Sequence, residues 1–242
     1  MSKFRKAATG MTLAEHLAEL RRRFLVSAVA VSLFGILAFI FYPSILKVLQ
    51  HPYCAAIPNH CSFLVTNPLD GLTLRVKIGF FGGFLLATPI LLFQAWRFIT
   101  PGLKARERRY ALPFVLASML FFSGGVLLAY FSFGHALQFL KSIGGSSLVT
   151  AYNPNQYLTL FLLMMFIFGL TFLFPVILVA LELANLVTPA QLLHSWRYAV
   201  IGITIASATF TPSGDPLSMM ALAVPLVVFY FLAIAVGKLL KR

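Results

Sequence analysis

The chain has 242 residues, of which 60% are hydrophobic and 10% are charged, and its mean hydropathy is +0.92. A soluble domain typically has about 25% charged residues, so this composition excludes an ordinary soluble protein and predicts a membrane protein. The 19 lysines and arginines and 6 acidic residues give a net charge of +13. The cations lie between apolar stretches rather than on a soluble face, so nucleic-acid binding is not expected. The 25 phenylalanines exclude a disordered chain.

Hydropathy predicts an all-α, polytopic membrane protein with six transmembrane helices, because a helix of about 20 apolar residues crosses roughly 30 Å of hydrocarbon. The predicted spans are residues 24–42, 72–99, 111–133, 157–181, 198–210 and 216–236. The fifth span is short: about 13 residues reach only about 20 Å. Kinks are expected at Pro89 and Pro175, because proline removes a backbone donor. Asp215 is expected to cap the sixth span, with Pro216 at its first helical position.

The distribution of basic residues predicts the orientation. With the N-terminus inside, only four of the 19 lysines and arginines fall outside, namely Lys47, Arg75, Lys77 and Lys141. This positive-inside pattern predicts that both termini are cytoplasmic and that the protein lies in the cell membrane. Trp96 and Trp196 are expected at headgroup level on the inner side. No repeat or linker divides the chain, so residues 1–242 are predicted to form one domain, with residues 1–23 as a cytoplasmic segment.

The N-terminal segment predicts an amphipathic helix. Thr12 and Glu15 form a capping box. Apolar residues then recur at helical spacing, at Leu13, Leu17, Leu20 and Phe24. We expect this helix to lie on the cytoplasmic surface and to lead into the first span. Glu19, on its polar side, either pairs with Arg23 at i,i+4 or offers its carboxylate to an incoming cation.

A second acidic residue stands in a basic loop after the second span. Glu107 is surrounded by cations that favour its ionised form: Lys104, Arg106, Arg108 and Arg109. This loop is either a basic cluster that fixes the topology or part of a binding site. Glu182, the one acid of the fourth span, is expected at the inner membrane boundary, with its side chain reaching the headgroups.

The two cysteines, Cys54 and Cys61, fall in the predicted outer loop between spans one and two. They form a disulfide, remain free thiols, or bind a metal together with His51 and His60. The disulfide is favoured because the compartment permits oxidation and the C-x-x-C spacing of a zinc site is absent. We therefore expect no metal and no cofactor.

Negative observations narrow the function. The sequence has neither a nucleotide-binding P-loop nor a helical H-E-x-x-H zinc motif, so no enzymatic activity is expected. The span centres lack Asp, Glu, Lys and Arg, whereas a proton-coupled carrier usually needs an ionisable relay. A small-solute transporter or channel therefore remains only as the alternative reading. Gly79, Gly83, Gly124 and Gly125 are expected to be sites of close helix packing.

Four segments together resemble the TatC family, the signal-peptide receptor of the twin-arginine protein translocase. In chain order they are His16–Arg23, Phe98–Leu103 followed by Glu107-Arg108-Arg109, Phe172–Pro175, and Thr211–Asp215. The ordered set covers nearly the whole chain. The resemblance implies a core subunit that scaffolds the export of folded proteins, driven by the proton motive force.

The resemblance also implies the binding residues. Glu19 and Glu107 match the acids that recognise the paired arginines of a signal peptide, and guanidinium groups suit forked hydrogen bonds to carboxylates. Arg21 and Phe98 lie in the same matching segments. Gln94 is expected either to line the peptide groove or to join two helices by a hydrogen bond.

The implied partners are single-span proteins of the TatA/TatB type, membrane lipids and other copies of this chain. Partner docking is assigned to the region of Thr171 and Leu173, and Asp215 matches a functional acid of the family. Many family members have a polar or acidic residue where this chain has Leu173. Docking therefore depends here either on a nearby group such as Thr171 or on apolar packing.

Overall fold

The structure is a computed structural model that describes residues 13–56, 63, 65, 67–99, 111–144 and 153–240. Within these residues the chain forms nine α-helices and no strand. The helices are α1 (Leu13–Ile40), α2 (Tyr42–Ala56), α3 (Asp70–Ile99), α4 (Ala111–Gly144), α5 (Pro154–Thr171), α6 (Phe174–Leu183), α7 (Pro189–His194), α8 (Trp196–Phe210) and α9 (Pro216–Leu240). The all-α fold predicted from hydropathy is confirmed.

In the part of the chain that the structure describes, five helical segments are long and apolar enough to cross a membrane. They are Leu17–Ile40, Asp70–Phe98, Leu112–Ile143, Pro154–Leu183 and Pro216–Leu239. The predicted fifth span corresponds to α8, which has 15 residues. At 1.5 Å per residue α8 reaches only about 22 Å, less than the hydrocarbon thickness of roughly 30 Å.

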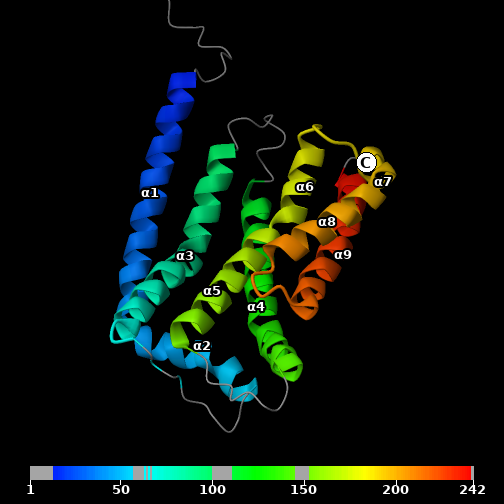
Figure 1. Ribbon diagram of the computed structural model, residues 1–242. Coiled ribbons are helices and arrows are strands. Elements are labelled where there is room, and N and C mark those ends of the chain that lie inside the picture. Colours follow the sequence, from blue (N-terminus) through cyan, green and yellow to red (C-terminus); the bar gives the residue numbers. More distant parts are fainter. Residues whose placement is uncertain are drawn as a thin grey trace, which may run out of the picture.

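The two ends of the bundle differ in the elements they contain (Figure 1). The start of α1 lies at the same end as the ends of α3 and α9, while α2 lies at the opposite end, near the start of α5. α3 continues through Pro89 as one helix but changes direction along its length. The fourth predicted span is interrupted between α5 and α6, just before Pro175. The missing N–H of this proline accounts for the break.

The N-terminal helix differs from the prediction. α1 is one helix of 28 residues that continues into the first span, rather than a separate helix lying on the surface. Its apolar side chains point away from the bundle: Leu17 is 63% exposed and Phe24 70% exposed. Glu19 and Arg23 instead face α3, where Arg23 bonds to Gln94. In a membrane, lipid is an apolar solvent, so the apolar stripe turns outward and the polar stripe turns toward protein.

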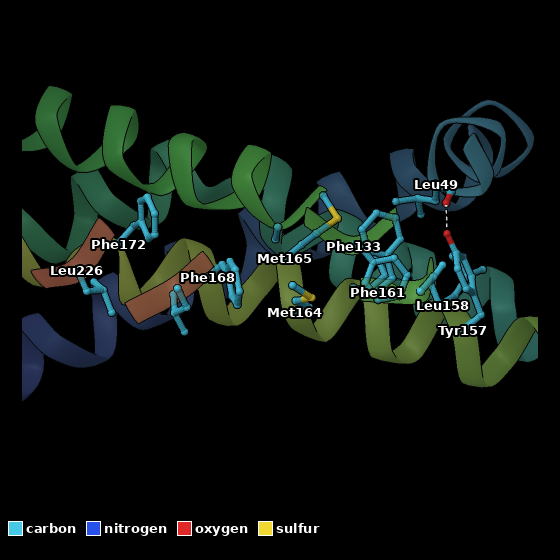
Figure 2. Packing of buried hydrophobic residues seen from close by; sticks show 14 of the residues in the cluster. Leu49, Phe133, Tyr157, Leu158, Phe161, Met164, Met165, Phe168, Phe172 and Leu226 are labelled. Carbon is cyan, nitrogen blue, oxygen red and sulfur yellow. Dashed lines mark hydrogen bonds between the residues drawn. The ribbon is translucent and has the colours of Figure 1, made fainter. Parts of the chain in front are cut away.

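The core runs along α5, which packs against α2 and α4 at one end and, through residues such as Leu226, against α9 at the other (Figure 2). The rings of Phe133 and Phe161 are stacked with centroids 4.4 Å apart. The Tyr157 hydroxyl donates to the carbonyl of Leu49 at 2.8 Å and fastens α5 to α2. This hydrogen bond satisfies a polar group that would otherwise be unpaired inside the apolar cluster.

Candidate functional site

Three polar side chains form a cluster between the start of α1 and the last turns of α3. Arg23 Nε donates to Glu19 Oε1 at 3.0 Å, and Arg23 Nη2 donates to the same oxygen. Arg23 Nη1 donates to Gln94 Oε1 at 3.3 Å. The i,i+4 pair expected between Glu19 and Arg23 is therefore present, and Gln94 makes the expected hydrogen bond between two helices. Arg23 connects the two helices through both contacts.

The contacts with Arg23 use one of the two carboxylate oxygens of Glu19. The side chains of Glu19 and Arg23 are 18% and 15% exposed. Oε2 of Glu19 is buried and has no hydrogen-bond partner among the described residues. A carboxylate oxygen has lone pairs for more than one donor, and leaving a buried acceptor unpaired costs free energy. Glu19 therefore has the capacity to accept a further hydrogen bond from a cationic group.

The remaining residues assigned to peptide binding are less completely placed. Arg21 is exposed on α1, and Phe98 is half-buried near the end of α3. Glu107 lies outside the described residues, as does the basic loop around it, so the predicted pairing of Glu107 with Glu19 stays a prediction.

The two residues assigned to partner docking line different cavities. Thr171 borders a cavity of about 570 Å³ between α5, α6 and α8, together with Ile203 and Phe210. Leu173 borders another cavity, of about 390 Å³, between α3, α4 and α6. The Thr171 hydroxyl donates to the carbonyl of Ile167 at 2.7 Å, so its proton is used within its own helix. Both cavities are almost entirely apolar in their lining residues.

Asp215 caps α9, as the Asp-Pro pair predicts. Its side chain is buried, and Oδ1 accepts the backbone N–H of Ser218 at 2.7 Å. Oδ2 accepts a hydrogen bond from the hydroxyl of Ser213. Because one carboxylate oxygen is bonded to the loop and the other to the first turn of α9, Asp215 orients the connection between α8 and α9.

Cys54 is disulfide-bonded at the end of α2. Cys61, the one other cysteine of the chain, lies outside the described residues. Among the described residues, no three His, Cys, Asp or Glu side chains are grouped so that they could hold a metal ion.

Two polar residues differ from their predicted surroundings. Glu182 is 0% exposed, with its carboxylate against Gly237 of α9, so its side chain is enclosed by protein and does not extend outward. Trp96 is buried between helices, where Nε1 donates to Ser118 Oγ at 2.7 Å and the ring stacks on Phe114. Neither feature could be inferred from the sequence, because hydropathy does not indicate which face of a span meets another helix.

Sequence reasoning also missed a polar cluster at the other end of the bundle. Asp70 at the start of α3 accepts hydrogen bonds from the side-chain amides of Asn153 and Asn155. Asn153 caps α5 by accepting the N–H of Asn155. The Asn-Pro pair at residues 153 and 154 is a sequence signal for this cap. The cluster fixes the start of α5 against the start of α3.

These features define a multi-pass, all-helical membrane protein with polar groups concentrated near the helix ends.

The family described as Sec-independent protein translocase protein (TatC) matches residues 15–225. A TatC protein of Frankia casuarinae is 37% identical over 244 residues, covering 96% of this chain and 67% of that protein. One of Aquifex aeolicus is 34% identical, covering 96% of this chain and 97% of that protein.

The fold agrees with these similarities. A crystal structure described as the twin-arginine translocase receptor TatC matches this chain with a TM-score of 0.79 and 32% identity. The match covers 94% of this chain and all of that one. The chain belongs to the TatC family. It is thus a component of a protein-translocation system, and a small-solute transporter is not favoured.

Proposed function

We propose that this protein is the receptor that binds twin-arginine signal peptides at the cytoplasmic face and scaffolds the export of folded proteins. The observation that supports the proposal is the state of Glu19. One of its carboxylate oxygens accepts hydrogen bonds from the guanidinium of Arg23. The other is buried without a hydrogen-bond partner among the described residues. A site that already holds one guanidinium and has a spare acceptor suits a second guanidinium.

The second acid of the proposed site is Glu107, which the family resemblance pairs with Glu19. Two adjacent arginines of a peptide require two acceptors, because each guanidinium is planar and always charged. Lysine offers a compact ammonium that forms no forked pair, so it fits such a site less well. Arg23 and Gln94 then act as positioning residues: they hold the Glu19 carboxylate against α3.

The orientation and partners belong to the same proposal. The positive-inside pattern favours cytoplasmic termini in a cell membrane, with the start of α1 at the inner surface. TatA/TatB-type proteins are proposed to dock near Thr171 and Leu173 by apolar packing, since the cavities at these residues offer few polar groups. Further copies of the chain and the proton motive force complete the proposed system.

The test is photo-crosslinking of the full chain, in membranes, to a twin-arginine precursor from a probe at exposed Leu20, beside Glu19. We expect strong crosslinking to the twin-arginine precursor and weak crosslinking to a twin-lysine version. Glu19→Gln should reduce the crosslink about tenfold, in line with the loss of a charge-assisted hydrogen bond. Glu15→Gln, one turn earlier in α1, is the matched control and should retain the crosslink.

Unchanged crosslinking in both Glu19→Gln and Glu107→Gln would overturn the assignment of the site. Equal crosslinking of the twin-arginine and twin-lysine precursors would overturn the proposed ligand class.

A further inference from the structure

A polar groove lies between α2 and α4, at the end of the bundle opposite to Glu19. It has a volume of about 730 Å³. Its polar lining consists of Lys47 and His51 from α2 and His135 and Gln138 from α4. Val48 and Phe131, 58% and 66% exposed, lie at its apolar side. Of the described residues that line it, none is acidic.

Two other cations near this end have defined contacts. Lys77 Nζ donates to Thr159 Oγ1 at 2.7 Å. The guanidinium of Arg75 lies over the ring of Tyr42, 5.0 Å from its centroid. Lys47 instead lines the groove beside two imidazoles. A positive charge beside imidazole and amide groups, with no carboxylate among the described lining residues, is an arrangement for an anion.

His135 has a defined tautomer. Its Nδ1 lies 3.2 Å from the carbonyl oxygen of Phe131. A carbonyl only accepts hydrogen bonds, so Nδ1 carries the hydrogen. This contact occupies Nδ1 and leaves Nε2 as the ring nitrogen available to a bound group. Among the described residues no carboxylate or thiolate joins the two imidazoles as a third ligand, which favours an anion over a metal as the occupant.

The depth of the groove matches the lipid headgroups. The apolar segment of α4 runs from Leu112 to Ile143, and about 20 residues counted from Leu112, as far as Phe131, already span roughly 30 Å of hydrocarbon. His135 follows one turn later. α2 begins at Tyr42, directly after the apolar part of α1 ends at Ile40. Counted from Leu112, the groove falls at the level of the lipid phosphates, with Val48 and Phe131 toward the acyl chains.

We propose that this groove binds the phosphate group of an anionic phospholipid. Lys47 and His135 contact the phosphate, and His51 and Gln138 complete the polar wall. The site is separate from the proposed peptide site, because it lies on α2 and α4 at the other end of the bundle (Figure 1). A bound lipid would connect α2 to α4 at the membrane surface.

The experiment is native mass spectrometry of the full chain in detergent micelles with added phosphatidylglycerol or phosphatidylcholine. We expect phosphatidylglycerol to be retained preferentially, and Lys47→Gln to reduce its retention about tenfold. Lys47→Arg should retain binding because it keeps the charge. Lys141→Gln is the matched control: it removes the same charge from exposed α4 surface that does not line the groove, and it should bind as the unmodified chain does.

Inorganic phosphate provides the second arm of the test. Millimolar phosphate should not displace the retained phosphatidylglycerol, because the acyl chains contribute to its binding. Displacement by phosphate would identify a soluble anion as the occupant and overturn the lipid assignment. Equal retention of the two lipids, or equal losses in Lys47→Gln and Lys141→Gln, would also overturn it. A thermal unfolding curve for each variant separates lost binding from lost folding.

Discussion

Gly83 of α3 lies directly against the backbone of Gly35 of α1. A Cβ atom added at Gly83 would lie 2.8 Å from the Cα of Gly35 and 2.8 Å from the carbonyl oxygen of Val31. Gly79, one turn earlier, makes a similar approach to Gly35. Because α1 packs mainly on α3, this glycine seam sets the separation of the two helices that carry Glu19 and Gln94.

Alanine at position 83 is therefore expected to destabilise the protein. Gly83→Ala forces two backbones apart and should lower the free energy of unfolding by about 1–3 kcal/mol, the usual cost of overpacking. Gly124→Ala in α4 is the matched control, because nothing lies within 4 Å of the added Cβ. It should be neutral or stabilising by up to about 1 kcal/mol, from helix propensity. The free energies of unfolding of both variants are measured in mixed micelles by tryptophan fluorescence. Equal stabilities of Gly83→Ala and Gly124→Ala would contradict the close contact at Gly83.

The buried contact between Trp96 and Ser118 gives a second prediction. Ser118→Ala leaves the indole N–H of Trp96 buried without its present acceptor, so stability should fall by about 1–3 kcal/mol. Ser123→Ala, on an exposed position of the same helix, is the control and should change little. The thermal midpoint and the indole N–H signal of Trp96 are the two measurements. An unchanged indole signal in Ser118→Ala would show that the hydrogen bond is absent in solution.

Much of the fold can be predicted from the sequence, because a helix that crosses a lipid bilayer needs a long apolar stretch. The start of α9 at Pro216 and the break before Pro175 follow from the chemistry of proline. Helix ends follow less well: α4 continues to Gly144, 11 residues beyond the predicted span, because a helix need not end where hydrocarbon ends. α2 was not predicted, since an amphipathic segment with Pro52 inside it lacks a clear hydropathy signal.

The faces of the helices could not be predicted from periodicity. In water an apolar stripe packs inward, and this rule placed Glu19 on an exposed side. In lipid the stripe with Leu17 and Phe24 is exposed, and Glu19 is turned toward protein. For the same reason, the sequence did not indicate that Glu182 is buried against Gly237. Local pairs such as Glu19 with Arg23 were predictable because they depend only on helical spacing.

Asp215 allows its capping role to be separated from its charge. Asp215→Ala removes the acceptor for the Ser218 N–H and should destabilise α9 by about 1 kcal/mol. Asp215→Asn retains a good cap and should unfold close to the unmodified chain. If the family resemblance identifies a functional charge, both variants lose export activity in a precursor export assay. Full activity in Asp215→Asn would show that the residue serves only as a cap.

The disulfide of Cys54 gives the last prediction. A cross-link closing a short loop stabilises by roughly 2–3 kcal/mol in the chain-entropy model, mainly by restricting the unfolded chain. Reduction should therefore lower the thermal midpoint of the unmodified protein. Without reductant, Cys54→Ser should already have the thermal midpoint of the reduced unmodified protein, and adding reductant should not change it further. Cys61→Ser should behave identically if these two residues form the pair. A reductant-sensitive midpoint in Cys54→Ser would assign the effect to something other than this bond.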